Sequence, residues 1–207
     1  MAVEPDDVKF VSALDDAAKK KAKEELNELN DKDRALAVQT LRQWALQQKW
    51  LKTPTDFGFL LRFMRARKFS QLGARQTLEN YWKQKTKSPA WFRNVDPHDK
   101  TIVEILKTGF YIIPKARDKQ GRRIVIEQLA KLDMTKVKKT WGLDNVFKAI
   151  CLCCEYLTKD ETVQVHGLCV LLDDTDVSMS HIMSMMGQEN GKKIMEYYQE
   201  PNDLTRP

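Results

Sequence analysis

Long apolar segments and secretory features are absent from the sequence. No window approaches the run of about 20 apolar residues that a membrane-spanning helix needs. The N-terminus carries acidic residues where a signal peptide would have a basic and then an apolar stretch. The 207 residues are 42% hydrophobic and 31% charged, which is typical of a globular protein. We therefore expect a cytoplasmic protein.

Cysteine is scarce, with only Cys151, Cys153, Cys154 and Cys169. Three of the four fall within one helical turn, and no Cys-x-x-Cys pair has a distant partner pair. This spacing argues against a disulfide framework and against a structural zinc site. We expect free thiols that are buried as small hydrophobic groups, with no metal and no cofactor.

Motifs for catalysis are also missing. The sequence has no glycine-rich phosphate loop, no His-Glu-x-x-His and no Gly-x-Ser-x-Gly. Cys154 and His166 could form a nucleophile pair, but nothing supplies a third orienting group. We therefore expect that the protein is not an enzyme.

One enzymatic alternative remains open at the end of an apolar stretch. Asp174 and Asp176 match the Asp-x-Asp pattern of magnesium-dependent phosphatases, in which the first carboxylate attacks phosphorus and the second transfers protons. That chemistry also needs a lysine and a second acidic pair further along the chain. Only 30 residues follow Val177, too few for the strands that would carry them.

The formal net charge of +6 favours anionic partners. Nucleic acid and anionic lipid headgroups both satisfy that preference. No recognised DNA- or RNA-binding pattern is present, so we expect no nucleic-acid partner. The lysines of residues 19–23 alternate with glutamates on a predicted surface helix, and we interpret them as a solvated face.

Residues 55–70 combine an apolar and a cationic pattern in one predicted helix. Asp56 is suited to cap its N-terminus. Leu60, Leu61 and Met64 have the spacing of a buried helix face. The cations recur every third residue along another side, with one more beside them: Arg62, Arg65, Lys68 and Arg67. The pattern predicts one face toward a core and one toward an anion.

The remaining pattern predicts the fold class α/β, with an N-terminal helical lobe ahead of an α/β layer. Ser12 is expected to cap a helix that extends to Leu29, a second helix is expected at 33–51, and Ser70 is expected to cap another. After Pro97 we predict a hairpin of 110–113 with 123–129 and a helix from Leu143. A central strand at 168–172, covered on both faces, and a last helix at 190–199 complete the prediction.

A family resemblance runs through these elements in order. Residues 56–69 closely resemble the signature helix of the animal branch of the CRAL-TRIO lipid-transfer family. Residues 117–122 before a strand, Val146-Phe147 in a long helix, and Gly167 with Asp173 around the apolar strand also match. The similarity extends from about Leu26 to Gln199.

The resemblance implies a helical lobe followed by an α/β domain whose sheet forms the floor of a lipophilic pocket. We accordingly expect a disordered N-terminus at 1–11, a helical lobe at 12–92, an incomplete CRAL-TRIO lipid-binding domain at 93–199 and a divergent tail at 200–207. The implied function is the binding and intermembrane transfer of a small hydrophobic ligand, of the retinoid, tocopherol or phospholipid class. The implied mode is peripheral docking of a monomer on phosphoinositide-containing membranes.

The resemblance also implies site residues. Arg67 corresponds to the arginine that faces a phosphoinositide headgroup, with Arg62, Arg65 and Lys68 as neighbours. The implied lining of the lipid pocket comes from the long helix, the apolar strand and the segment after it: Phe147, Ile150, Cys154, Leu168, Val170, Leu172, Met179 and Met183. Methionines suit a pocket that adapts to a flexible ligand.

Two departures from the family pattern stand out. Asp176 occupies a turn position where relatives have glycine, which puts the geometry of that turn in doubt. The pattern also stops at Gln199, before the further strands and the helix that closes the pocket in relatives. We therefore expect a truncated isoform or fragment that is marginally stable and binds lipid weakly. A helical protein-interaction fragment without ligand binding is a further alternative.

Overall fold

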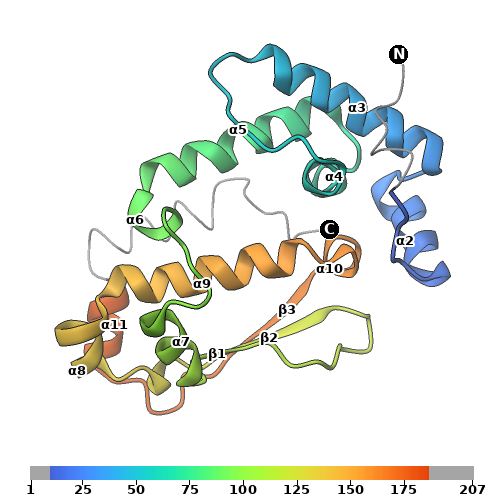
Figure 1. The fold of residues 1–207 in the computed structure, drawn as a ribbon. Coiled ribbons are helices and arrows are strands. Elements are labelled where there is room, and N and C mark those ends of the chain that lie inside the picture. Colours follow the sequence, from blue (N-terminus) through green and yellow to red (C-terminus); the bar gives the residue numbers. More distant parts are fainter. Residues whose placement is uncertain (1–9, 187–207) are drawn as a thin grey trace. The chain divides into compact units, whose positions relative to one another are not determined.

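The computed structural model describes residues 10–186 in two compact units (Figure 1). The first unit comprises residues 10–82 together with Thr158–Gly167, and the second comprises Lys83–Leu157 with residues 168–186. The first unit is helical and the second contains the sheet. The α/β expectation, with a helical region ahead of a sheet, is confirmed.

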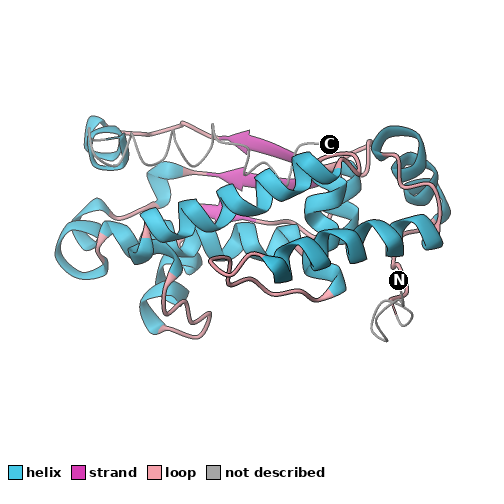
Figure 2. Ribbon diagram, turned by 90° about the horizontal axis from the view of Figure 1, so that it is seen from above, coloured by secondary structure: helices cyan, strands magenta, loops and turns pink. Residues whose placement is uncertain are grey.

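The first unit consists of helices joined by loops (Figure 2). Its helices are α2 (Asp16–Leu26), α3 (Asp31–Gln47), α4 (Phe57–Ala66), most of α5 (Gln71–Lys87) and α10 (Glu161–His166). Helices α3, α4 and α5 share one apolar core, and α2 and α10 contribute to a second, smaller one. The predicted apolar face of α4 is confirmed, because Leu60, Leu61 and Met64 are all buried. Its predicted cap is confirmed as well: the Asp56 carboxylate accepts a hydrogen bond from the Phe59 amide at 2.9 Å.

Two predicted helix boundaries in the first unit are wrong for identifiable reasons. Asp15, not Ser12, caps α2, because its carboxylate accepts from the Ala18 amide at 2.7 Å. That helix ends at Leu26 rather than Leu29, since Asn27 adopts a left-handed conformation with φ 63° and its amide bonds back to Ala22. The expectation for Ser70 is confirmed, because its hydroxyl accepts from the Gly73 amide at the start of α5.

The second unit has a three-stranded mixed sheet of order β1-β2-β3. β1 (Tyr111–Ile112) is antiparallel to β2 (Arg123–Glu127), which confirms the predicted hairpin pairing. β2 is parallel to β3 (Leu168–Leu172), with Val125 opposite Val170. The helices and helical turns of this unit are α6 (Pro89–Phe92), α7 (Lys100–Lys107), η1 (Leu129–Lys131), α8 (Met134–Lys136), η2 (Val137–Trp141), α9 (Leu143–Thr158) and α11 (Met179–Met186).

The core of the second unit lies between the sheet and α9, which runs along the sheet (Figure 1). Phe147 and Ala149 of α9 are buried in the same cluster as Val125 of β2, and Leu168 of β3 packs against it. Trp91 of α6 stacks on Phe147 with ring centroids 4.5 Å apart. This stack adds a large apolar area to the core, which is the main favourable term in folding.

The strand at 168–172 differs from the prediction in its position in the sheet. It was expected to be central and covered on both faces, but within the described residues it pairs with β2 alone. Val170, Leu171 and Leu172 are 48%, 50% and 68% exposed. Continuous apolar sequence therefore did not indicate a covered central strand here. The helix predicted at 190–199 lies outside the described residues.

Replacing Asp56 with alanine is expected to lower the free energy of unfolding by about 1 kcal/mol, because the first turn of α4 loses its side-chain acceptor. Asp56→Asn keeps an acceptor and is the matched control. Urea unfolding followed by circular dichroism measures both. Equal urea midpoints for Asp56→Ala and wild type would contradict this account of the α4 cap.

Candidate functional site

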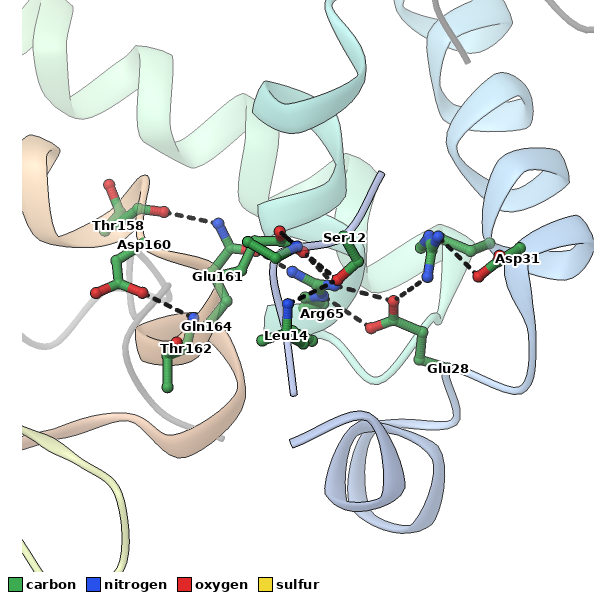
Figure 3. Close-up of polar contacts among 12 residues, drawn as sticks. Ser12, Leu14, Glu28, Asp31, Arg65, Thr158, Asp160, Glu161, Thr162 and Gln164 are labelled. Carbon is green, nitrogen blue, oxygen red and sulfur yellow. Dashed lines mark hydrogen bonds and ion pairs between the residues drawn. The ribbon is translucent and has the colours of Figure 1, made fainter. Parts of the chain in front are cut away.

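The arginines of α4 do not share one environment. Arg65 is 0% exposed, and its guanidinium lies in a cluster of polar side chains within the first unit (Figure 3). Its Nε donates to Glu28 Oε2 at 2.7 Å, and its Nη2 donates to Glu28 Oε1 at 2.9 Å. Its Nη2 also forms an ion pair with Glu161 at 3.0 Å, and its Nη1 donates to Gln164 at 2.8 Å. Arg65 therefore connects α4 to α10 and to the segment after α2.

The partners of Arg65 are themselves held by further hydrogen bonds. The Glu161 carboxylate accepts from the Ser12 hydroxyl at 2.8 Å and from the Ala13 amide at 2.7 Å. Gln164 donates to the Thr158 carbonyl at 2.9 Å. Buried charges are tolerated only when they are paired and hydrogen-bonded in this way. The cluster is thus a folded-state scaffold that fixes α10.

Arg62 is also buried, with 3% of its surface exposed. Its guanidinium lies over the Phe59 ring, 4.2 Å from the ring centroid, and 5.0 Å from that of Tyr81. Its Nη1 donates to the Thr158 hydroxyl at 3.1 Å. The aromatic faces replace part of the hydration that the cation loses on burial.

Arg67 and Lys68 follow the end of α4 and are more accessible. Arg67 is half-buried, and its Nε donates to the Thr77 hydroxyl of α5 at 2.7 Å. Lys68 is exposed and adopts φ 49°. Gly73 lies beside Arg67, since a Cβ there would come within 3.2 Å of the arginine Cβ. Of the four cations expected to face a headgroup, these two are the ones that are not buried.

The residues expected to line a lipid pocket fall into two groups. Phe147, Ile150 and Leu168 belong to the core of the second unit or pack directly against it. Cys154 is half-buried, with its sulfur 3.9 Å from the Tyr111 hydroxyl oxygen. The other four are exposed by 48–68%, namely Val170, Leu172, Met179 and Met183. These four side chains leave apolar surface on β3 and α11.

Partial burial raises the pKa of two titratable groups of the second unit. Burial raises the pKa of the Cys153 thiol to about 12, and the neighbouring Cys154 adds to the effect. The nucleophilic thiolate is therefore scarce at neutral pH. Burial likewise raises the pKa of Glu127, at the end of β2.

The acidic turn after β3 has its own hydrogen bonds. Asp173 accepts from the Gln128 amide at 2.9 Å and from the Thr175 amide at 3.1 Å. These bonds lower the pKa of the Asp173 carboxyl. Asp174 and Asp176 are exposed, and within residues 10–186 no group of three His, Cys, Asp or Glu side chains is placed to hold a metal ion. Asp176 adopts φ 60°, the conformation that glycine provides without strain.

Comparison with known families and proteins covers most of the chain. Residues 30–102 match the model described as "Pinta-like, UBA domain", and residues 106–201 match the model described as "CRAL/TRIO domain". "Alpha-tocopherol transfer protein-like" of Mus musculus is 30% identical over 197 residues, which cover 95% of this chain and 55% of the relative. The Homo sapiens protein of that name is 31% identical over the same shares.

"Clavesin-1" of Xenopus laevis is 32% identical over 124 residues, which cover 60% of this chain and 36% of the relative. Two lines of similarity therefore converge on one family. Residues 106–201 therefore form part of a CRAL/TRIO domain. It spans about half the length of the curated relatives it matches.

Sequence reasoning missed the buried cluster around Arg65. The regular spacing of the charged residues predicts an exposed face of the helix, whereas Arg62 and Arg65 are buried with the apolar side of α4. A buried arginine needs acidic partners, and this need was the sequence signal for the cluster. Glu28 and Glu161 are those partners, and they lie in distant parts of the sequence. Among the described helices, none combines the length and apolar character needed to cross a bilayer.

Replacing Arg65 with methionine is expected to cost about 3–5 kcal/mol of unfolding free energy, because Glu161 then loses its buried counter-charge and Glu28 keeps only Arg34. Lys52→Met removes one positive charge from an exposed side chain and serves as the control. Urea midpoints of the two variants measure the difference. A midpoint for Arg65→Met equal to that of Lys52→Met would rule out a stabilising role for the cluster.

Proposed function

We propose that the protein binds one small hydrophobic molecule and carries it between membranes without chemical change. The observation that carries the proposal is the match of residues 106–201 to the CRAL/TRIO domain. The relatives named "Alpha-tocopherol transfer protein-like", which align over 95% of the chain, favour a tocopherol over a retinoid or phospholipid as cargo. The proposed activity is that of a cytoplasmic, non-catalytic carrier acting as a monomer.

The proposed cargo contact is the apolar surface of the second unit. Leu172 and Met183 are each more than 60% exposed, as is Met179. Apolar side chains at this exposure gain about 25 cal/mol for each Å² that a ligand covers. Phe147, Ile150, Cys154, Leu168 and Val170 complete the proposed lining, with the first of these forming the rigid base through its stack on Trp91.

The proposed membrane contact is the end of α4. A guanidinium can form two parallel hydrogen bonds with a phosphate, and an adjacent ammonium adds a further positive charge. The Nε of Arg67 donates a hydrogen bond to the Thr77 hydroxyl, which restricts the side chain before an anion binds. Lys68 is exposed beside it. We assign Arg67 and Lys68 to phosphoinositide docking, and we give Arg62 and Arg65 the supporting role of holding α4 in place.

The first test is flotation of the protein with vesicles that contain phosphatidylinositol bisphosphate. Arg67→Ala is expected to reduce the bound fraction by about tenfold, since a bidentate phosphate contact is lost. Arg93→Ala removes the same charge from another exposed position and should bind as the wild type does. Unchanged flotation of Arg67→Ala, with an unfolding midpoint like that of wild type, would refute the docking role.

The second test is titration of the protein with a fluorescent tocopherol analogue. Leu172→Asp is expected to weaken binding by about tenfold, because it places a charge on the proposed cargo surface. Leu72→Asp makes the same change at an exposed leucine of the helical lobe and is expected to have no effect. Equal affinities for these two variants would remove β3 from the cargo site.

A further inference from the structure

A hollow of about 310 Å³ lies in the first unit, between α2, the turn after it and the start of α3. Its charged lining comes from Lys19, Lys20, Lys23, Glu28, Asp31 and Arg34. The volume is at the lower end of the range of about 300–1,000 Å³ that is typical of small-molecule sites. The lysine run that the sequence indicated as a solvated face thus forms one wall of a concave surface.

The two acids of this lining are already neutralised by arginines. Glu28 pairs with Arg65 at 2.7 Å and with Arg34 at 3.0 Å, and all three side chains are buried. Asp31 pairs with the other end of the Arg34 guanidinium at 2.9 Å (Figure 3). The lining of the hollow itself carries four cations against these two carboxylates, so it has an excess of positive charge.

The three lysines have no strong partner of their own. Their spacing of i, i+1 and i+4 on α2 places them on one side of the helix. Lys19 lies 3.8 Å from Asp16 and Lys20 lies 3.9 Å from Glu24, and both pairs are exposed. Exposed pairs of this kind contribute little. Lys23 has no ion pair within the part of the chain that the structure describes.

Arg34 gives the hollow a fixed cation as well. It is 8% exposed, and its guanidinium carbon lies 5.3 Å from the centroid of the Phe10 ring. Its buried Nε has no hydrogen-bond partner among the described residues. The site therefore combines a buried arginine, one of whose donors lacks a described partner, with three exposed lysines.

We propose that this hollow binds a group that carries several phosphates, through Lys19, Lys20 and Lys23 against the Arg34 base. Phosphate monoesters offer three acceptor oxygens each and about two negative charges, which suits a lining with excess positive charge whose lysines have only weak, exposed ion pairs. The same chemistry is present in a free inositol polyphosphate and in a phosphorylated lipid headgroup. The site is separate from Arg67 and does not depend on the proposed cargo.

The test is calorimetric titration of the full chain with inositol hexakisphosphate, alongside flotation with phosphatidylinositol bisphosphate vesicles. The double variant Lys20→Gln/Lys23→Gln is expected to weaken binding of the soluble probe by about tenfold. The control Lys21→Gln/Lys32→Gln removes the same total charge at residues outside the lining and is expected to change binding by less than about twofold. Circular dichroism melts of both double variants show whether the fold is kept.

The two arms identify the source of the phosphates. If Lys20→Gln/Lys23→Gln weakens binding of inositol hexakisphosphate but not vesicle flotation, relative to the control variant, the hollow binds a free polyphosphate. If it weakens both, the hollow binds a lipid headgroup. No binding by wild type, or equal losses in the two double variants, overturns the proposal. Because Arg67→Ala is measured separately, a negative result for the hollow does not affect the test of the docking role of α4.

Discussion

The buried charge of Arg65 is the constraint on which the helical unit depends. A guanidinium removed from water is tolerated only if acceptors surround it. Glu28, Glu161 and Gln164 supply those acceptors from two distant places in the sequence, the segment after α2 and helix α10. Because Arg65 needs these acceptors, the segment after α2 and helix α10 must lie next to α4. The N-terminal segment is then positioned too, because Ser12 and Ala13 both donate to Glu161.

The same cluster organises the electrostatics of the surface around it. Arg34 and Arg65 pair with Glu28, and Arg34 also pairs with Asp31. The two acids that line the hollow are therefore engaged by arginines rather than by the lysines of α2. By placing Arg62 against aromatic rings, the fold leaves Arg67 and Lys68 as the accessible cations at the end of α4. Interior ion pairing thus decides where positive charge remains available at the surface.

Local sequence signals predicted most elements and some of the site. Asp56, Ser70 and the apolar stripe of α4 act through neighbours within four residues, so the sequence contains the whole interaction. The fates of Arg62 and Arg65 depend on residues more than 30 positions away in the chain, and pattern alone assigned them to a surface. The edge position of β3 also follows from tertiary pairing, which an apolar run of five residues does not encode. Asp176 shows the converse case, because an aspartate adopts the left-handed turn without glycine.

The assignment of α10 to the helical unit has a consequence for how the chain acquires its fold. Arg65 and Gln164 are separated by 99 positions, so a chain growing on the ribosome exposes the arginine well before its last acceptors exist. At about 5–20 residues per second, that interval lasts on the order of 5–20 seconds. Until α10 emerges, Glu28 is the only one of these acceptors available to Arg65. Completion of the helical unit therefore follows synthesis of α9, most of which belongs to the second unit.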